Sequence, residues 1–418
     1  MSAVAAPRDG DGARPDAPVP RGQVTGRAEM APEERLLLLS AGGPANDDTI
    51  RQTARHGVDW PRFLGLAQLE RAVPVIYPRF RAVVPDVIPG DVLDQMRRLA
   101  LVSDFAMMHL ESRLRESLHA LGRAQVRVML LKGAALAHSA YDGVRQRPMS
   151  DIDVLVDPKT ARTARRVMLD AGWREITGGI PDAAYERHHH LPPLLDTRSR
   201  ELQLEIHTAL FPEGQPFAFD APDLWQRAQS LGGGFPHAFV PDLAHSLLHA
   251  CLHFLWSHQG RFGVWRTIRD INAISRSKPV DWRAFVAAAR AARGDTSCYW
   301  TLRIAQVTAG VGVPADVLEA LRPPRRSYVL HAIERHFLMN LFPVQFGCPS
   351  VALDHALWEL AVMPRRSGHG EIRPWDQEAE FAVPHGEGSA SRPARHSDRL
   401  RRFLASPGYI RSLLRLRG

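Results

Sequence analysis

The spacing of hydrophobic positions changes along the chain and separates a central segment from two flanks. From residue 31 to about residue 120, apolar residues recur three and four positions apart, as in Phe63, Leu66 and Ala67, which is the spacing of helices. Residues 126–131 (VRVMLL) are instead a short, β-branched apolar run, which predicts a buried strand. Helical spacing returns from Asp242 to about Arg335. The pattern therefore predicts strands in the centre and helices on both sides.

The central segment, at about 123–212, combines both kinds of element into a small α/β unit. Alternating apolar and polar positions predict strands, and helical spacing with a glycine stop predicts helices between them. The predicted elements after the first strand are a helix at 134–141, a strand at 151–156, a helix at 158–172, a short strand at 173–176, a loop at 178–200 and a strand at 202–207.

Composition divides the rest of the chain. Residues 1–30 consist mainly of Pro, Gly, Asp and Arg, which predicts a disordered tail. Residues 364–398 are polar and predict a linker, and the last twenty residues form a basic, amphipathic end. The predicted organisation is a tail at 1–30, a helical region at 31–122, an α/β core at 123–215, a second helical region at 216–363, and a linker with a basic tail at 364–418.

Charge and cysteine content narrow the class of protein. The 418 residues carry a formal net charge of +8, which favours anionic partners such as nucleotides or nucleic acid, unless it reflects only a general preference for arginine. Cys251, Cys298 and Cys348 are far apart, so neither a disulfide framework nor a cysteine zinc site is expected. The first thirty residues contain no continuous apolar stretch of a secretory signal. No segment approaches the ~18 apolar residues of a membrane span, and we expect a cytoplasmic protein.

Two acidic side chains share one face of the strand at 151–156. Side chains alternate along a strand, so Asp151 and Asp153 lie on one face and Ile152, Val154 and Val156 on the other. Two neighbouring carboxylates repel each other, which destabilises the fold. A divalent cation that prefers oxygen ligands would remove this repulsion. The alternative is a strand edge whose two acids face water.

A third carboxylate follows the same rule on a later strand. Gln203, Glu205 and His207 share a face, while Leu202, Leu204 and Ile206 share the buried one. Acids from two strands that converge suit metal ions that clamp a triphosphate and activate a hydroxyl for in-line attack. The alternative for Glu205 alone is a solvated strand face.

Basic and glycine positions next to these acids suit phosphate groups. Lys132-Gly133-Ala134 joins the first strand to a helix start, where free backbone N–H groups and a glycine allow close approach of an anion. Arg145 and Arg147 precede the aspartate strand, and arginine binds phosphate in a bidentate manner. A solvated basic loop is the alternative for the two arginines.

The run LLKGAALAHSAYDGVRQRPMSDIDVLVD, together with the later Glu205-Ile206-His207, resembles a bacterial group known as the uncharacterised nucleotidyltransferase family, within the DNA polymerase beta-like superfamily. The resemblance covers about residues 30–340. It rests on Lys132-Gly133, Tyr141, Arg147 and the Asp151-Ile152-Asp153 motif. It departs from the wider superfamily, whose glycine turn usually begins with Gly where this chain has Lys132.

The resemblance implies an α+β fold in which a small nucleotidyltransferase core with a mixed β-sheet is flanked by N-terminal and C-terminal helical regions. It implies a transferase that moves a nucleoside monophosphate from a nucleoside triphosphate such as ATP to an acceptor hydroxyl, releasing pyrophosphate. Two Mg²⁺ ions are expected, with Mn²⁺ as a substitute, bound by Asp151, Asp153 and Glu205, which are also the catalytic residues.

The remaining predicted roles concern the nucleotide and the substrate. Lys132, Gly133, Ala134 and Arg147 are predicted to bind the nucleotide, and His207 and His190 are possible substrate contacts. A small molecule, a peptide or protein hydroxyl and a tRNA end all remain open as acceptors. The rival hypothesis is a catalytically silent module of the same fold that binds a nucleotide or a partner.

Three other patterns have simpler interpretations. His188, His189 and His190 are consecutive, and neighbouring side chains in a loop are not expected to face one metal ion. His245, His249 and His253 lie on one helical face, which is most simply a packed face. Arg266 and Asp270 are four residues apart, which suggests an intrahelical ion pair, although the resemblance implies a bracing role at the active site. The basic C-terminal end suits RNA, a membrane surface, a docking partner or solvent.

Overall fold

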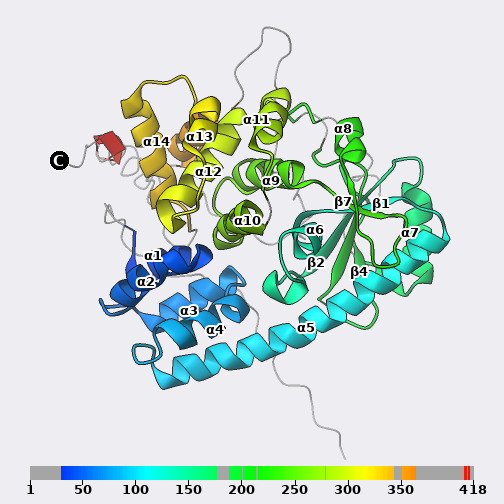
Figure 1. Ribbon diagram of the computed structural model, residues 1–418, viewed down its shortest axis with the longest axis horizontal. Helices are drawn as coiled ribbons and strands as arrows, with labels where there is room; N and C mark the ends of the chain where they lie inside the picture. The colour runs from blue at the N-terminus through cyan, green and yellow to red at the C-terminus, as the bar shows by residue number, and fades with distance from the viewer. Residues whose placement is uncertain are drawn as a thin grey trace, which may run out of the picture.

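A mixed β-sheet lies at one side of the protein and helices make up the rest (Figure 1). The computed structural model describes residues 30–176, 188–199, 201–212, 215–219, 221–277, 279–342, 351–363, 409–411 and 413–414. Nearly all of the predicted tail at 1–30 and of the predicted linker and basic tail at 364–418 lies outside these residues, as does much of the predicted loop at 178–200.

Within the described residues, the sheet has seven strands in the order β3-β4-β5-β2-β1-β7-β6. Its centre is formed by β2, which pairs antiparallel with β1 and parallel with β5. The strands are β1 (Val128–Leu130), β2 (Asp151–Val156), β3 (Trp173–Glu175), β4 (Leu194–Asp196), β5 (Gln203–His207), β6 (Gln229–Ser230) and β7 (Ala238–Val240).

The two faces of the sheet differ in chemistry, as strand alternation predicts. One face carries Ile152, Val154 and Ile206 and packs against α5 (Gly90–Arg123) and α7 (Ala161–Asp170), within one buried cluster. The opposite face of β2 and β5 carries their acidic side chains. This face is approached by α6 (Lys132–Ser139), which packs against α9 (Leu243–Leu252).

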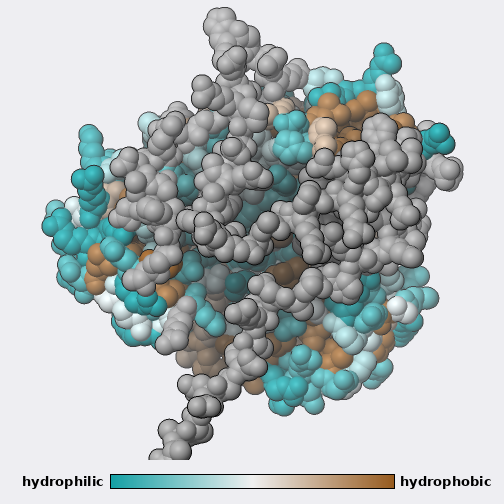
Figure 2. Space-filling view, turned by 180° about the vertical axis from the view of Figure 1, so that it is seen from behind, coloured by the Kyte–Doolittle hydropathy of each residue, from teal (hydrophilic) through white to brown (hydrophobic). Residues whose placement is uncertain are grey.

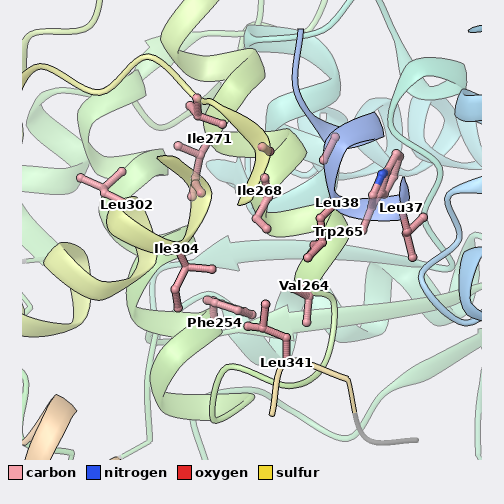
Figure 3. Close-up of a cluster of buried hydrophobic side chains, with 14 of the residues drawn as sticks. Leu37, Leu38, Phe254, Val264, Trp265, Ile268, Ile271, Leu302, Ile304 and Leu341 are labelled. Atoms are coloured by element: carbon pink, nitrogen blue, oxygen red, sulfur yellow. The ribbon is translucent and has the colours of Figure 1, made fainter. Parts of the chain in front are cut away.

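The two helical flanks share one hydrophobic core although they are distant in sequence. Leu37 and Leu38 of the first helix lie beside Trp265 and Ile268, while Ile304 lies further along the same cluster (Figure 3). The remaining helices are α1 (Pro32–Ala41), α2 (Asp47–Ala54), α3 (Trp60–Leu69), α4 (Val73–Val83), α8 (Ala221–Gln226), α10 (Val264–Ser277), α11 (Trp282–Ala291), α12 (Asp295–Ala309), α13 (Ala315–Leu321), α14 (Ser327–Met339) and α15 (Val351–Val362), with short 3₁₀ turns at Pro44–Asn46 and Val144–Gln146.

The predicted fold class is confirmed: a mixed sheet core is flanked by helices before and after it in the chain. The structure adds three strands that the hydrophobic pattern did not predict, namely β4 within the predicted loop and β6 and β7 within the predicted second helical region. Each of these strands is only two or three residues long, and alternation is not detectable over so few positions. The exact domain boundaries stay a prediction.

Apolar and polar side chains are interspersed on the visible described surface of the rear face (Figure 2). Among the described residues, no helix is both long enough and apolar enough to cross a lipid bilayer.

A buried histidine makes stability dependent on pH. His336 of α14 is 2% exposed, and burial lowers the pKa of its imidazole to about 4, although Asp354 opposes the shift. The unfolded chain, with a pKa near 6.5, then binds more protons between pH 4 and pH 6.5. We expect the free energy of unfolding to fall by roughly 1–3 kcal/mol as the pH drops from 7 to 4 because of this one residue. Urea unfolding at several pH values should show a shallower dependence in His336→Gln, and equal slopes would contradict the assignment.

Candidate active site

The acidic face of β2 and β5 brings the predicted carboxylates together. The two strands are parallel, and their register sets Asp153 directly beside Glu205, with Asp151 beside Gln203 one pleat away. Adjacent strands lie about 4.8 Å apart, so paired carboxylates on one face are forced into proximity. The carboxylates of the two strands therefore lie side by side, as the alternation of residues predicts.

Asp153 is the most enclosed of the three acids. It is 3% exposed and accepts hydrogen bonds from Lys132 Nζ at 2.8 Å and from His207 Nε2 at 2.9 Å, both at Oδ1. Burial by itself raises the pKa of this carboxyl, but the charge of Lys132 and the bond from His207 outweigh it and hold the pKa well below its usual range. Asp153 is therefore ionised.

Asp151 has the opposite environment. Burial, followed by the neighbouring charge of Asp153, raises the pKa of its carboxyl above the ordinary value, against the attraction of Lys132. An incoming cation would stabilise the charged form of Asp151 and reverse this shift. Asp151 is thus the carboxylate whose state responds most directly to a bound positive charge.

Lys132 is the built-in cation of the site. It has a φ of +47°, a left-handed backbone conformation that non-glycine residues adopt uncommonly and that concentrates at functional sites. Burial lowers the pKa of its ammonium, but the charges of Asp153 and Glu205 outweigh burial and raise the pKa above its usual value. Lys132 therefore stays protonated. Lys132 and His207 therefore offset part of the repulsion between the acids, which the sequence argument had assigned to metal ions alone.

The donor set suits a hard divalent cation. Asp153, Glu205 and His207 each offer one ligand atom, and these atoms lie within 4.8 Å of one another. Two of the three are carboxylate oxygens, which Mg²⁺ prefers, and the second oxygen of Asp153 is not used by Lys132 or His207. Asp151 is not part of this closest group, but it lines the same cavity.

Arg147 is bound to another acid. Its guanidinium makes a bidentate ion pair with Asp270 of α10, with Nε–Oδ1 at 2.6 Å and Nη2–Oδ2 at 2.8 Å, and Tyr141 donates to the same carboxylate at 2.8 Å. The intrahelical pair between Arg266 and Asp270 that spacing suggested is wrong, because Asp270 points across to Arg147 instead. The Arg147–Asp270 pair ties the loop before β2 to α10 and so braces the cavity wall.

A cavity of about 440 Å³ lies between the acidic face of the sheet and the helices. Lys132, Gly133, Asp151, Asp153 and Glu205 line it from the sheet side. Gly133 has little spare room, since a β-carbon there would lie 3.3 Å from Arg147 Nη1 and from Met149 Sδ. Ala134, predicted to bind nucleotide, is buried at 1% exposure and is not part of the lining. Its predicted role stays a prediction.

Two arginines of the cavity were not predicted as site residues. Arg71, which follows α3, and Arg266, on α10, line the cavity, and neither side chain has an ion-pair or hydrogen-bond partner among the described residues. Burial and then the charge of Arg147 lower the pKa of Arg266, against the attraction of Glu70 and Asp151. Unpaired guanidinium groups in a pocket suit an anionic ligand. Only the helical fold brings residues 71 and 266 together, so spacing gave no signal for Arg71.

The predicted histidine face divides into two environments. His245 is held by Asp242, whereas His249 and His253 line the cavity. Burial, reinforced by the charge of Lys132, lowers the pKa of His249 to about 3, so the cavity wall is uncharged there. A π-helical turn, His253–Ser257, follows α9, and such turns often occur at functional sites.

His207 and His190 also lie next to the acids. His190 forms an isolated antiparallel bridge with His207, whose Nε2 is 2.9 Å from Asp153 Oδ1 and 3.4 Å from Glu205 Oε2. Burial lowers the pKa of His190 to about 4, while Glu205 opposes the shift. Their predicted contacts with substrate stay a prediction.

A family model described as "Uncharacterised nucleotidyltransferase" matches residues 56–310, more than half of the chain. The chain belongs to this family, which makes it a nucleotidyltransferase by class. The matched range includes all of the acids, basic residues and histidines described above, from Arg71 to Asp270. No curated protein and no solved structure matches the chain.

Proposed function

We propose that this protein transfers a nucleoside monophosphate from a nucleoside triphosphate to an acceptor hydroxyl, by the metal-dependent chemistry of the DNA polymerase beta-like superfamily, in the cytoplasm. The observation that carries the proposal is the parallel register that sets Asp153 beside Glu205, with Asp151 on the same face of one cavity. Three acids beside cationic side chains suit a triphosphate with divalent cations better than they suit a plain binding surface.

Asp151, Asp153 and Glu205 would hold the Mg²⁺ ions, which supply charge neutralisation and Lewis-acid activation at the α-phosphate. Lys132 and Gly133 lie beside these acids, where the triphosphate is expected. In the reaction, the acceptor oxygen forms a bond to the α-phosphorus while the bond to the β-phosphate oxygen breaks and pyrophosphate leaves. Glu205 takes the acceptor proton in this scheme. Arg147 acts by holding the wall through Asp270 rather than by direct phosphate contact.

Arg71 and Arg266 are assigned to the distal phosphates. Substituting Arg266 by methionine removes a guanidinium that makes no hydrogen bond or ion pair among the described residues. We expect the KM for the nucleoside triphosphate to rise about 10–100-fold with kcat little changed, because ground-state binding is lost. Steady-state kinetics would measure this, with Arg283→Met on the exposed part of α11 as the matched control. An unchanged KM would remove Arg266 from the binding site.

The test of the proposed function is transfer from α-³²P-labelled nucleoside triphosphates. Each of the four triphosphates would be combined with Mg²⁺ and with a panel of acceptors that includes small-molecule extract, total tRNA, peptides and the protein itself. Label in an acceptor together with pyrophosphate release is the expected result. Binding of nucleotide without Mg²⁺ dependence and without release would instead support the rival binding module. The rival is favoured by one observation, the ion pair with Lys132 that already neutralises Asp153.

A further inference from the structure

Three consecutive histidines form a compact group beside the end of β5. One ring nitrogen from each of His188, His189 and His190 lies within 4.8 Å of the others. Their ring centroids are 4.5, 4.1 and 4.9 Å apart. Imidazole nitrogens this close together can coordinate one ion after small adjustments of the side chains. We propose that these three histidines form a metal site of their own, specific for a borderline transition metal such as Zn²⁺.

The backbone explains how neighbouring side chains come to face one point. The sequence predicts a loop here, and neighbouring side chains in a loop are not expected to face one metal ion. The chain instead bends at His188 and His189 before His190 pairs with His207. Thr208 and Ala209 donate backbone hydrogen bonds to the carbonyl of His189, so the bend is fixed to the end of β5. The expectation that the three side chains would not face one ion was therefore wrong, because their ring nitrogens lie together.

The hydrogen bonding of His190 suits metal coordination, in which the neutral imidazole is the ligand species. His190 Nδ1 lies 2.7 Å from the carbonyl oxygen of Leu191 and donates a hydrogen bond to it. That bond fixes the tautomer of His190, as outer hydrogen bonds commonly do at zinc sites.

His207 links this group to the acidic face. Its ring centroid is 5.2 Å from those of both His189 and His190, and its Nδ1 is buried without a hydrogen-bond partner in the described parts of the chain. Its other nitrogen bonds Asp153. A metal at the three histidines would thus lie beside the residue that orients Asp153. Nitrogen donors favour Zn²⁺ over Mg²⁺, so this site and the carboxylates select different ions.

The test measures metal content rather than activity. The full chain would be purified without a polyhistidine tag, passed over a chelating resin, loaded with Zn²⁺ and analysed by mass spectrometry of the bound metal. We expect about one Zn²⁺ per chain, bound at least tenfold more weakly after His188→Ala, His189→Ala and His190→Ala are combined. His56→Ala, in the exposed turn after α2, is the matched control and should retain the metal.

The carboxylates provide the competing explanation and a second set of variants. Zinc that is lost in Asp153→Asn with Glu205→Gln, but kept in the triple histidine variant, would place the ion at the acids and overturn the proposal. Zinc binding that no variant alters, or no zinc at all, would overturn it as well. X-ray absorption at the zinc edge of the wild-type protein gives an answer even where the triple variant does not fold. Scattering from three imidazoles is expected, and an oxygen-dominated shell would contradict the site. None of these outcomes depends on nucleotidyl transfer.

Discussion

Nucleotidyl transfer is expected to fall by about 10³-fold or more when Asp153 is replaced by asparagine, because preorganised charge at the reacting phosphate is removed. Asp153 is the carboxylate that both Lys132 and His207 orient, and it is paired in register with Glu205. Asparagine keeps the shape and one hydrogen-bond acceptor but loses the charge. The measurement is transfer of α-³²P label under saturating nucleotide, with far-UV circular dichroism to establish that the variant is folded.

The matched control for this variant lies four residues away. Asp157 follows β2 directly and is exposed, and in the described structure its side chain accepts a hydrogen bond only from the backbone N–H of Lys159. Asp157→Asn should retain transfer within about twofold, since surface substitutions away from a site have small effects. Glu205→Gln should cost a similar factor to Asp153→Asn, and the double variant little more, because residues that act as a unit are not additive. Transfer that persists in folded Asp153→Asn would refute the assignment of the acids.

The stability of the fold is expected to drop by about 3–5 kcal/mol when Asp270 is replaced by alanine, since the change leaves a buried guanidinium without its partner. The side chain of Asp270 is 6% exposed and that of Arg147 is 12% exposed, and Tyr141 shares the same carboxylate. Burial lowers the pKa of Arg147, but the pair with Asp270 outweighs it and raises the pKa. A guanidinium keeps its proton in proteins, so Arg147 would stay charged after its partner is removed. Urea unfolding at pH 7 would measure the loss.

A second variant separates the pair from general disruption. Arg147→Met combined with Asp270→Leu removes both charges, and it should recover much of the lost stability because replacing a buried pair by apolar groups is often neutral. The exposed pair Arg51–Asp48 is the control, and Asp48→Ala should change the free energy of unfolding by less than about 1 kcal/mol. A loss from Asp270→Ala no greater than this control would show that the brace contributes nothing to stability.

Local pattern in the sequence was sufficient for part of the site. The alternation of residues 151–156 required that Asp151 and Asp153 lie on one face of their strand. The alternation of residues 202–207 likewise required that Glu205 and His207 lie on one face of theirs. The position of Lys132-Gly133 between a strand and a helix was also readable. These features depend on periods of two and four residues, so neighbouring positions contain all the information.

The predictions that failed involved contacts or bends that no local period encodes. Spacing paired Asp270 with Arg266 four residues away, but its partner is Arg147, 123 residues distant. The three histidines were expected to diverge because the bend at His188 and His189 was not visible in their sequence. The short strands β4, β6 and β7 are defined by their pairing partners more than by their own residues.

The sequence by itself thus determined the type of fold, the acidic face and the family to which its motifs point, because alternation and helical spacing are local properties of the chain. Only the tertiary structure decided which charges meet. Lys132 forms an ion pair with Asp153, and Arg147 forms one with Asp270. Arg71 and Arg266 line the same cavity without an ion-pair partner among the described residues. The physical reason is that ion pairs and cavities form between elements whose packing depends on the whole core, so their partners are fixed by burial across the fold and not by distance along the chain.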